Sequence, residues 1–152
     1  MKKLVPIAAL AVVFLAAGCA KTPVKTTVID DETAVIIVPE AACETLEDYL
    51  ALLKDEGKLT YEGEKGDYGL FITSVNGKEN EVISSSPSSS EGYAWTVYID
   101  FTVHGGVIYA GDGETCVYGD TTLYKASYGV SALPCIENGT YALVYEHYEY
   151  SW

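Results

Sequence analysis

The feature that most constrains the fold is a strictly alternating run, YAWTVYIDF, at residues 93–101. Every second residue in this run is large and apolar: Tyr93, Trp95, Val97, Ile99 and Phe101. A period of two predicts a β-strand with one face in the core. Trp95 is therefore expected to point inward, and Tyr98 toward the opposite side.

Short runs of the same kind occupy most of the chain. We predict further strands at residues 34–38, 59–62, 68–75 and 140–148, and a hairpin-rich region at 104–125. Asn76-Gly77 and Asn138-Gly139 favour tight turns, because both residues of such a dipeptide readily adopt positive φ. The segment SSSPSSSEG, residues 84–92, has no apolar side chain to bury, so it is predicted to be an exposed loop.

One segment has a helical period instead. Its apolar stripe has the spacing i, i+3, i+4 and i+7: Leu46, Tyr49, Leu50 and Leu53. Thr45 with Asp48 predicts the N-terminal cap, and Gly57 predicts the C-terminal end. One helix with several antiparallel strands predicts an α+β domain, in which the helix packs on a mainly antiparallel sheet.

The N-terminus has the three-part layout of an export signal. Lys2 and Lys3 precede an apolar run that ends in small residues at 16–18, and Cys19 follows directly. The run is shorter than the ~20 apolar residues that a membrane-spanning helix needs. The placement of Cys19 resembles the lipobox of bacterial lipoproteins, in which the cysteine receives a diacylglycerol and becomes the mature N-terminus.

We therefore predict a lipoprotein signal peptide at residues 1–18, a flexible tether at 19–32 and a folded domain at 33–152. Cys19 is the expected lipid-attachment site, and the domain is expected at the outer face of the cytoplasmic membrane. The alternative is plain secretion, with cleavage near Ala17 or Ala20.

Charge excludes one class of partner. The chain has no arginine, and without Lys2 and Lys3 its seven lysines oppose 22 acidic residues, a net charge of about −15. A surface of this sign repels phosphate backbones, so nucleic-acid binding is not expected.

Three cysteines remain besides Cys19: Cys43, Cys116 and Cys135. Their number allows one disulfide at most, and no pair has the C-x-x-C spacing of a zinc or redox site. Cys116 with Cys135 is the preferred pairing, because both lie among the late strands and turns. The other two pairings stay open, as does the alternative that all three are buried, unreactive thiols.

The remaining polar patterns give little support for catalysis or metal binding. His104 and His147 are far apart in sequence, and neither has a nucleophile at a spacing that suggests a catalytic site. Asp112, Glu114 and Asp120 lie in an acidic loop that lacks the ligand spacing of an EF-hand, so no metal and no cofactor is expected.

Thirteen tyrosines are notable in so short a chain. Tyrosine suits both the rim of a thin β core, which is the simpler interpretation, and a surface that recognises rings or sugars. If such a ligand face exists, Tyr98, Tyr124 and Tyr128 are the residues we expect on it.

The segments LEDYLALL, GDYGLFITSVNGKE, YAWTVYID and SYGVSALPCIENGTYALVYE together resemble a domain family of unknown function found in Gram-positive lipoproteins. That family is similar to the C-terminal β domain of the cobalamin carriers transcobalamin and intrinsic factor. The resemblance covers residues 34–148 and implies a β-grasp-like fold. Residues 102–121 form an insertion relative to it, at the point where relatives carry an Asn-Gly turn.

In the cobalamin carriers this β domain is one half of a clamp, and the present chain has no room for the helical half. A single half would enclose too little of a corrinoid for tight binding. We therefore expect a lipid-anchored, non-enzymatic binding module of the cell envelope, with a small molecule as its ligand. The alternative is a structural or protein-interaction domain accessory to a surface complex or transporter, and an unrecognised hydrolase is a distant third.

Overall fold

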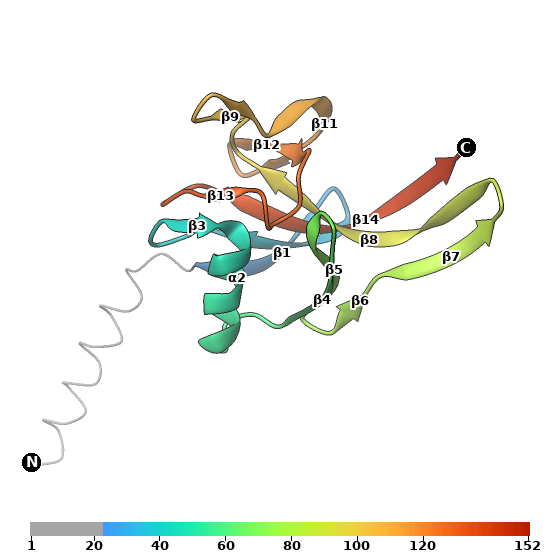
Figure 1. The fold of residues 1–152 in the computed structure, drawn as a ribbon, viewed down its shortest axis with the longest axis horizontal. Helices are drawn as coiled ribbons and strands as arrows, with labels where there is room; N and C mark the ends of the chain where they lie inside the picture. Colours follow the sequence, from blue (N-terminus) through green and yellow to red (C-terminus); the bar gives the residue numbers. More distant parts are fainter. Residues whose placement is uncertain (1–22) are drawn as a thin grey trace, which may run out of the picture.

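The computed structural model describes residues 23–152, which contain fourteen β-strands and one helix (Figure 1). Seven strands form the main sheet: β1 (Val24–Ile29), β2 (Glu32–Ile37), β7 (Glu81–Ser86), β8 (Ser89–Ile99), β11 (Ala110–Tyr118), β12 (Thr121–Ala126) and β14 (Tyr141–Ser151). Their order is β1-β2-β14-β8-β12-β11, and β7 pairs with the outer part of β8. Every pair in this sheet is antiparallel.

The remaining strands form three smaller sheets. Three of them make a sheet of their own: β4 (Tyr61–Gly66), β5 (Gly69–Val75) and β6 (Lys78–Glu79). The other four make two-stranded pairs: β3 (Cys43–Thr45) with β13 (Pro134–Cys135), and β9 (Val103–His104) with β10 (Val107–Ile108). The helix, α2 (Leu46–Asp55), follows β3 directly.

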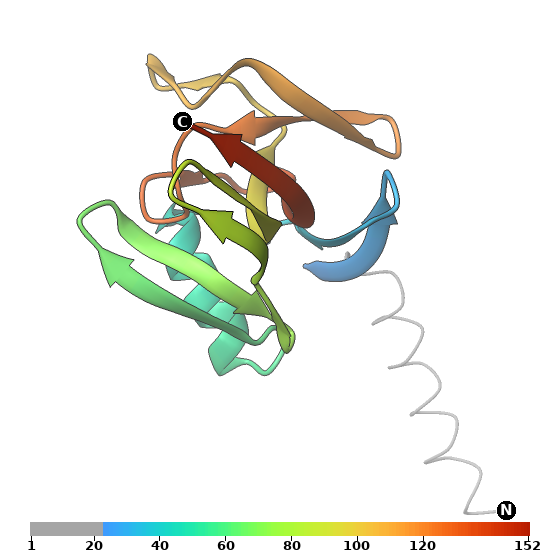
Figure 2. The same ribbon diagram turned by 90° about the vertical axis from the view of Figure 1, so that its right-hand side faces the viewer.

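The main sheet separates two apolar cores. On one face Ile37, Ile99 and Leu143 pack against α2 and the small β4-β5-β6 sheet. The other face buries Ile36, Leu123 and Ala142. The sheet curls around this second core so that its end strands β1 and β11 contact each other (Figure 2). Alternation along each strand divides the side chains between the two cores.

Local sequence accounts for the helix and the turns. The Thr45 side chain accepts a hydrogen bond from the Asp48 amide, and the Asp48 carboxylate accepts one from the Thr45 amide, which together form a capping box. Leu46, Tyr49, Leu50 and Leu53 are all buried, as predicted. Asn76 and Gly77 both have positive φ, 49° and 83°, as the predicted tight turn requires.

Two predictions about irregular segments are wrong. The expected tether at residues 19–32 includes β1, which pairs with β2 over all six of its residues. The expected loop at 84–92 is a hairpin, because β7 continues to Ser86 and β8 begins at Ser89. Backbone pairing holds this hairpin, together with a 2.9 Å contact between the Ser86 and Ser89 hydroxyl oxygens.

The described chain is thus a mainly β fold with one helix and mostly antiparallel strands. Trp95 is buried at 7% exposure, as its place in the alternating run predicts. No helix within residues 23–152 has the length and apolar character needed to cross a membrane. The predicted signal peptide and Cys19 lie outside the described residues.

Candidate functional site

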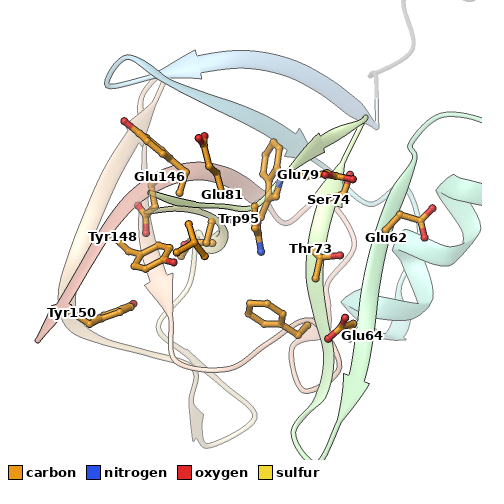
Figure 3. Close-up of a pocket in the computed structure, with 16 residues that line it drawn as sticks. Glu62, Glu64, Thr73, Ser74, Glu79, Glu81, Trp95, Glu146, Tyr148 and Tyr150 are labelled. Carbon is orange, nitrogen blue, oxygen red and sulfur yellow. Dashed lines mark hydrogen bonds between the residues drawn. The ribbon is translucent and has the colours of Figure 1, made fainter. Parts of the chain in front are cut away.

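A cleft of about 700 Å³ opens between the β4-β5-β6 sheet and the outer half of the main sheet (Figure 3). Its walls come from β4 and β5 on one side and from β8 and β14 on the other, with the start of β7 between them. The lining residues are Glu62, Glu64, Phe71, Thr73, Ser74, Glu79, Asn80, Glu81, Val82, Tyr93, Ala94, Trp95, Thr96, Glu146, Tyr148 and Tyr150.

Aromatic rings supply much of the apolar surface of the cleft. Trp95 and Tyr93 both pack on Tyr145, with ring centroids 5.2 and 5.5 Å apart, respectively. Tyr148 and Tyr150 stack on each other at 5.4 Å on the β14 wall. Phe71 lines the cleft from β5 and is 59% exposed. Exposure of so large an apolar ring beside a cavity is typical of a binding surface.

Asn80 joins the two sheets at the back of the cleft. Its side-chain amide donates to the Ile72 carbonyl of β5 at 3.2 Å, and its side-chain oxygen accepts from the Trp95 amide of β8 at 3.1 Å. The Trp95 indole also donates to the Lys78 carbonyl at 2.8 Å. These bonds satisfy each buried donor and hold the indole in one position.

Five carboxylates surround the opening. Glu62, Glu64, Glu79 and Glu81 are exposed, and within residues 23–152 none of these four forms an ion pair. The fifth, Glu146, is paired with Lys125 at 2.9 Å. No lysine is among the lining residues. The cleft therefore has a negative rim around an aromatic interior.

The electrostatic influence of these carboxylates reaches neighbouring groups. Burial, followed by the negative charge of Glu81, raises the pKa of Tyr145 behind the cleft wall. Burial, followed by the charge of Glu146, raises the pKa of Glu32 on β2. Burial is the larger cause in both cases, and the neighbouring carboxylate adds to it in the same direction.

The three tyrosines predicted as a ligand face do not share a face. Tyr98 is buried at 4% exposure and donates a 2.7 Å hydrogen bond to Glu146. Burial and that hydrogen bond raise the pKa of Tyr98 far above its ordinary value. Tyr124 packs against the core on the opposite face of the sheet. Tyr128 is 46% exposed and lines a cavity of about 280 Å³ that shares Phe71 and Trp95 with the main cleft.

The preferred disulfide is also wrong. Cys116 belongs to the core inside the curled sheet, whereas Cys135 belongs to the core beneath α2, so the main sheet separates the two thiols. Burial raises the pKa of both Cys116 and Cys135 to about 11, so each thiol is mostly protonated at neutral pH and attacks slowly. The residue opposite Cys135 is Cys43, in the adjacent strand β3.

The acidic loop and the histidines lie outside the cleft. Glu114 is on β11 and accepts a 3.0 Å hydrogen bond from Lys125, and the Tyr98 hydroxyl lies 3.3 Å from it. The His147 ring contacts the Glu91 carboxylate at 2.8 Å, and His104 lies at the β9–β10 turn. Within the part of the chain that the structure describes, no three His, Cys, Asp or Glu residues are grouped so as to hold a metal ion.

Comparison of the chain with models of known protein families, with curated proteins and with solved structures finds no match. The geometry of the cleft is therefore the basis for a functional assignment. A concave, aromatic-lined opening with a few polar groups is the usual form of a small-molecule site.

Proposed function

We propose that this protein is a lipid-anchored, non-enzymatic binding module of the cell envelope, and that its ligand is a small molecule bound in the cleft. The observation that carries the proposal is the cleft itself. Its volume of about 700 Å³ lies within the ~300–1,000 Å³ range of small-molecule sites, and aromatic side chains line it from both sheets.

The packing around the cleft supports a preformed site. Asn80 and the Trp95 indole tie the β5-β6 hairpin to β8, so both walls belong to hydrogen-bonded sheets rather than to separate loops. A site that is ordered before binding loses less conformational entropy when the ligand enters.

The α+β, β-grasp-like classification and the relation to the β domain of cobalamin carriers are part of this proposal. Their support is the single helix packed against strands and the sequence segments that resemble the lipoprotein family. A corrinoid is not the proposed ligand, because a domain of this kind offers only one half of the clamp.

Trp95 provides a direct test of the cleft. The chain has two tryptophans, and Trp152 lies outside the lining residues. In a Trp152→Phe variant of the full-length protein, emission reports on Trp95 alone. A library of amines, sugars, nucleosides, amino acids and corrinoids should contain compounds that change this emission saturably. A library in which no compound does so would favour the protein-interaction alternative.

The anchor is tested separately. Mass spectrometry of protein purified from a Gram-positive host should find a diacylglycerol on Cys19, and a Cys19→Ala variant should appear in the culture medium. A variant that stays with the membrane would contradict lipid attachment at Cys19.

One observation favours the alternative of a structural or protein-interaction domain. All six residues of β7 are exposed, and β7 pairs with β8 on one side only. An open strand edge can accept a strand from a partner protein. Pull-down by the unmodified chain, but not by a variant with proline at Ile83 in β7, would support this function.

A further inference from the structure

We infer that the cleft binds an organic cation, an amine or quaternary ammonium group carried on an apolar body. This inference rests on the proposed function and names the chemical class of its ligand. Two independent properties of the lining residues lead to it, namely the balance of charges and the character of the interior surface.

The charge balance favours a positive ligand. Four exposed carboxylates without ion-pair partners in residues 23–152 lie around one opening, and the lining has no lysine. A cation entering the cleft gains attraction from several carboxylates at once, whereas an anion is repelled by all of them. Because these groups are exposed, the attraction is expected to weaken as salt is added.

The aromatic interior favours a cation with an apolar body over a small metal ion. Aromatic ring faces attract positive charge through their quadrupole, and quaternary ammonium ligands are commonly held in this way. Trp95 is 7% exposed, so the accessible rings are those of the half-buried Tyr148 and the exposed Tyr150 on β14. The protein itself shows this contact nearby, where the Lys78 Nζ lies 4.4 Å from the centroid of the Tyr145 ring. Phe71, at 59% exposure, offers apolar surface for the remainder of the ligand.

The test compares three probes that share a benzyl group and differ in charge. Benzyltrimethylammonium is positive, N-benzylacetamide is neutral and phenylmethanesulfonate is negative. We expect benzyltrimethylammonium to bind on the order of ten-fold more tightly than the neutral probe, and the sulfonate to show no binding. Affinity is measured by the Trp95 emission of the Trp152→Phe protein, at low salt and again at high salt.

Charge-removing variants locate the site. Glu62→Gln with Glu64→Gln keeps the size of both side chains and is expected to weaken benzyltrimethylammonium about three- to ten-fold, with little change for the neutral probe. Glu44→Gln is the matched control, because Glu44 is equally exposed but lies on β3 outside the lining. Circular dichroism verifies that each variant is folded.

The outcomes separate the two proposals. Equal or tighter binding of the neutral or anionic probe would overturn the cation inference and leave the cleft as a ligand site. The same inference fails if no probe binds while other library compounds do. If neither the probes nor any library compound binds, both the cation inference and the proposed function fail. The probe comparison uses unaltered cleft residues, so it remains decisive even if the double variant does not fold.

A second inference comes from the cysteines. We propose that Cys43 and Cys135 form a disulfide in the exported protein. Thr45 pairs with Pro134, so a regular ladder would place Glu44 opposite Cys135. A bulge between Pro134 and Cys135 shifts the register by one residue, and Cys43 lies opposite Cys135 instead. Opposite residues in an antiparallel pair have Cα atoms ~4.5–5.5 Å apart, which is within the ~4.4–6.8 Å that a disulfide spans.

The oxidant is an external disulfide, written R–S–S–R. Cys43 is half-buried and Cys135 is buried, so the Cys43 thiolate attacks first, forming a mixed disulfide and releasing one thiol RSH. The Cys135 thiolate then attacks the Cys43 sulfur and releases the second RSH. The two protein thiols lose two electrons and two protons in total, and the external disulfide gains both.

Alkylation after unfolding tests this pairing. Full-length protein equilibrated with oxidised glutathione, then unfolded and alkylated without reductant, should be labelled at Cys116 and at neither Cys43 nor Cys135. Reductant should lower its melting temperature by on the order of 10 °C, and should have no such effect on a Cys43→Ser variant. Labelling at Cys43 and Cys135, or a disulfide that contains Cys116, would overturn the proposal.

Discussion

Lys125 connects two carboxylates on the concave side of the main sheet. Its Nζ lies 3.0 Å from Glu114 and 2.9 Å from Glu146. The Tyr98 hydroxyl donates its one hydrogen to Glu146 at 2.7 Å, and its oxygen lies 3.3 Å from Glu114. The hydrogen bond and the positive charge of Lys125 lower the pKa of Glu114. Burial by itself would lower the pKa of Lys125. The hydrogen bonds and charges of Glu146 and Glu114 outweigh burial, so the pKa of Lys125 is raised.

The variant Lys125→Met should therefore destabilise the protein. Glu146 would lose its cationic partner while half-buried, and we expect a loss of about 1–2 kcal/mol at pH 7, less than for a fully buried pair. A carboxyl group with a lowered folded pKa stabilises the protein above its unfolded pKa of ~4.3, and this contribution is lost as the pH falls through the folded pKa.

Urea unfolding of Lys125→Met and the unmodified protein at several pH values checks this prediction. The difference in the free energy of unfolding should shrink below pH 4.3, as Glu114 becomes protonated. Lys25→Met is the control, since Lys25 is exposed on β1 and forms no ion pair within the described residues. If the difference in the free energy of unfolding stayed constant below pH 4.3, Lys125 would stabilise the protein through packing alone.

At the scale of elements, the β7–β8 hairpin depends on Gly92. A Cβ added at Gly92 would lie 2.0 Å from the Glu81 carbonyl oxygen and 2.9 Å from the Tyr148 hydroxyl. β7 therefore approaches β8 more closely than any side chain at this position permits. The approach occurs next to the register shift between Val82 and Ser84.

We expect Gly92→Ala to separate the start of β7 from β8 and to cost about 1–3 kcal/mol. Amide hydrogen exchange should become faster across β7, while α2 keeps its protection. Gly111→Ala is the matched control, because a Cβ at Gly111 meets no atom within 4 Å. Unchanged exchange in β7 would mean that the strand can relax without losing its pairing.

At the scale of the whole molecule, Asn80 couples the two sheets that form the cleft. Asn80→Ala removes its bonds to both β5 and β8 and leaves the Trp95 amide without its partner, so we expect a loss of about 1–3 kcal/mol. Asn80→Asp retains an oxygen that can accept from Trp95, but it loses the donor to Ile72 and adds a negative charge beside Glu79 and Glu81, so the two variants are compared at high salt, where that charge is screened. Chemical unfolding should rank Asn80→Ala as the less stable variant, and equal stabilities would argue against the Trp95 bond.

Local patterns predicted much of the fold. The helix stripe, its Thr45 cap, the Asn76-Gly77 turn and the inward position of Trp95 all depend on neighbouring residues, and all are confirmed. Where a segment depends on distant partners, prediction failed. The serine-rich segment has no apolar residue between Ser84 and Gly92, and ladder bonds between β7 and β8 hold it. β1 has three apolar residues without strict alternation, and of these only Ile29 is buried, so its pairing with β2 is not visible in its sequence.

The cleft was missed for a similar reason. Its walls meet because β5 and β8, which are separated along the chain, are joined by Asn80 and by the bond from the Trp95 indole to the Lys78 carbonyl. In the run GLFITSV of β5, apolar residues are consecutive, so the sequence does not reveal that Phe71 faces outward while Ile72 is buried. Of the three tyrosines predicted on a ligand face, Tyr98 and Tyr124 pack toward different cores because the sheet has an apolar layer on each face, and Tyr128 is exposed.

The position of β1 has a mechanical consequence for an anchored protein. Only four residues separate Cys19 from Val24, the first residue of β1, and they span at most ~18 Å when fully extended. With a lipid on Cys19, this short linker would keep the domain close to the bilayer surface. An anionic membrane surface attracts cations within a Debye length, ~8 Å at physiological salt, so the layer that the domain occupies would be enriched in the proposed class of ligand.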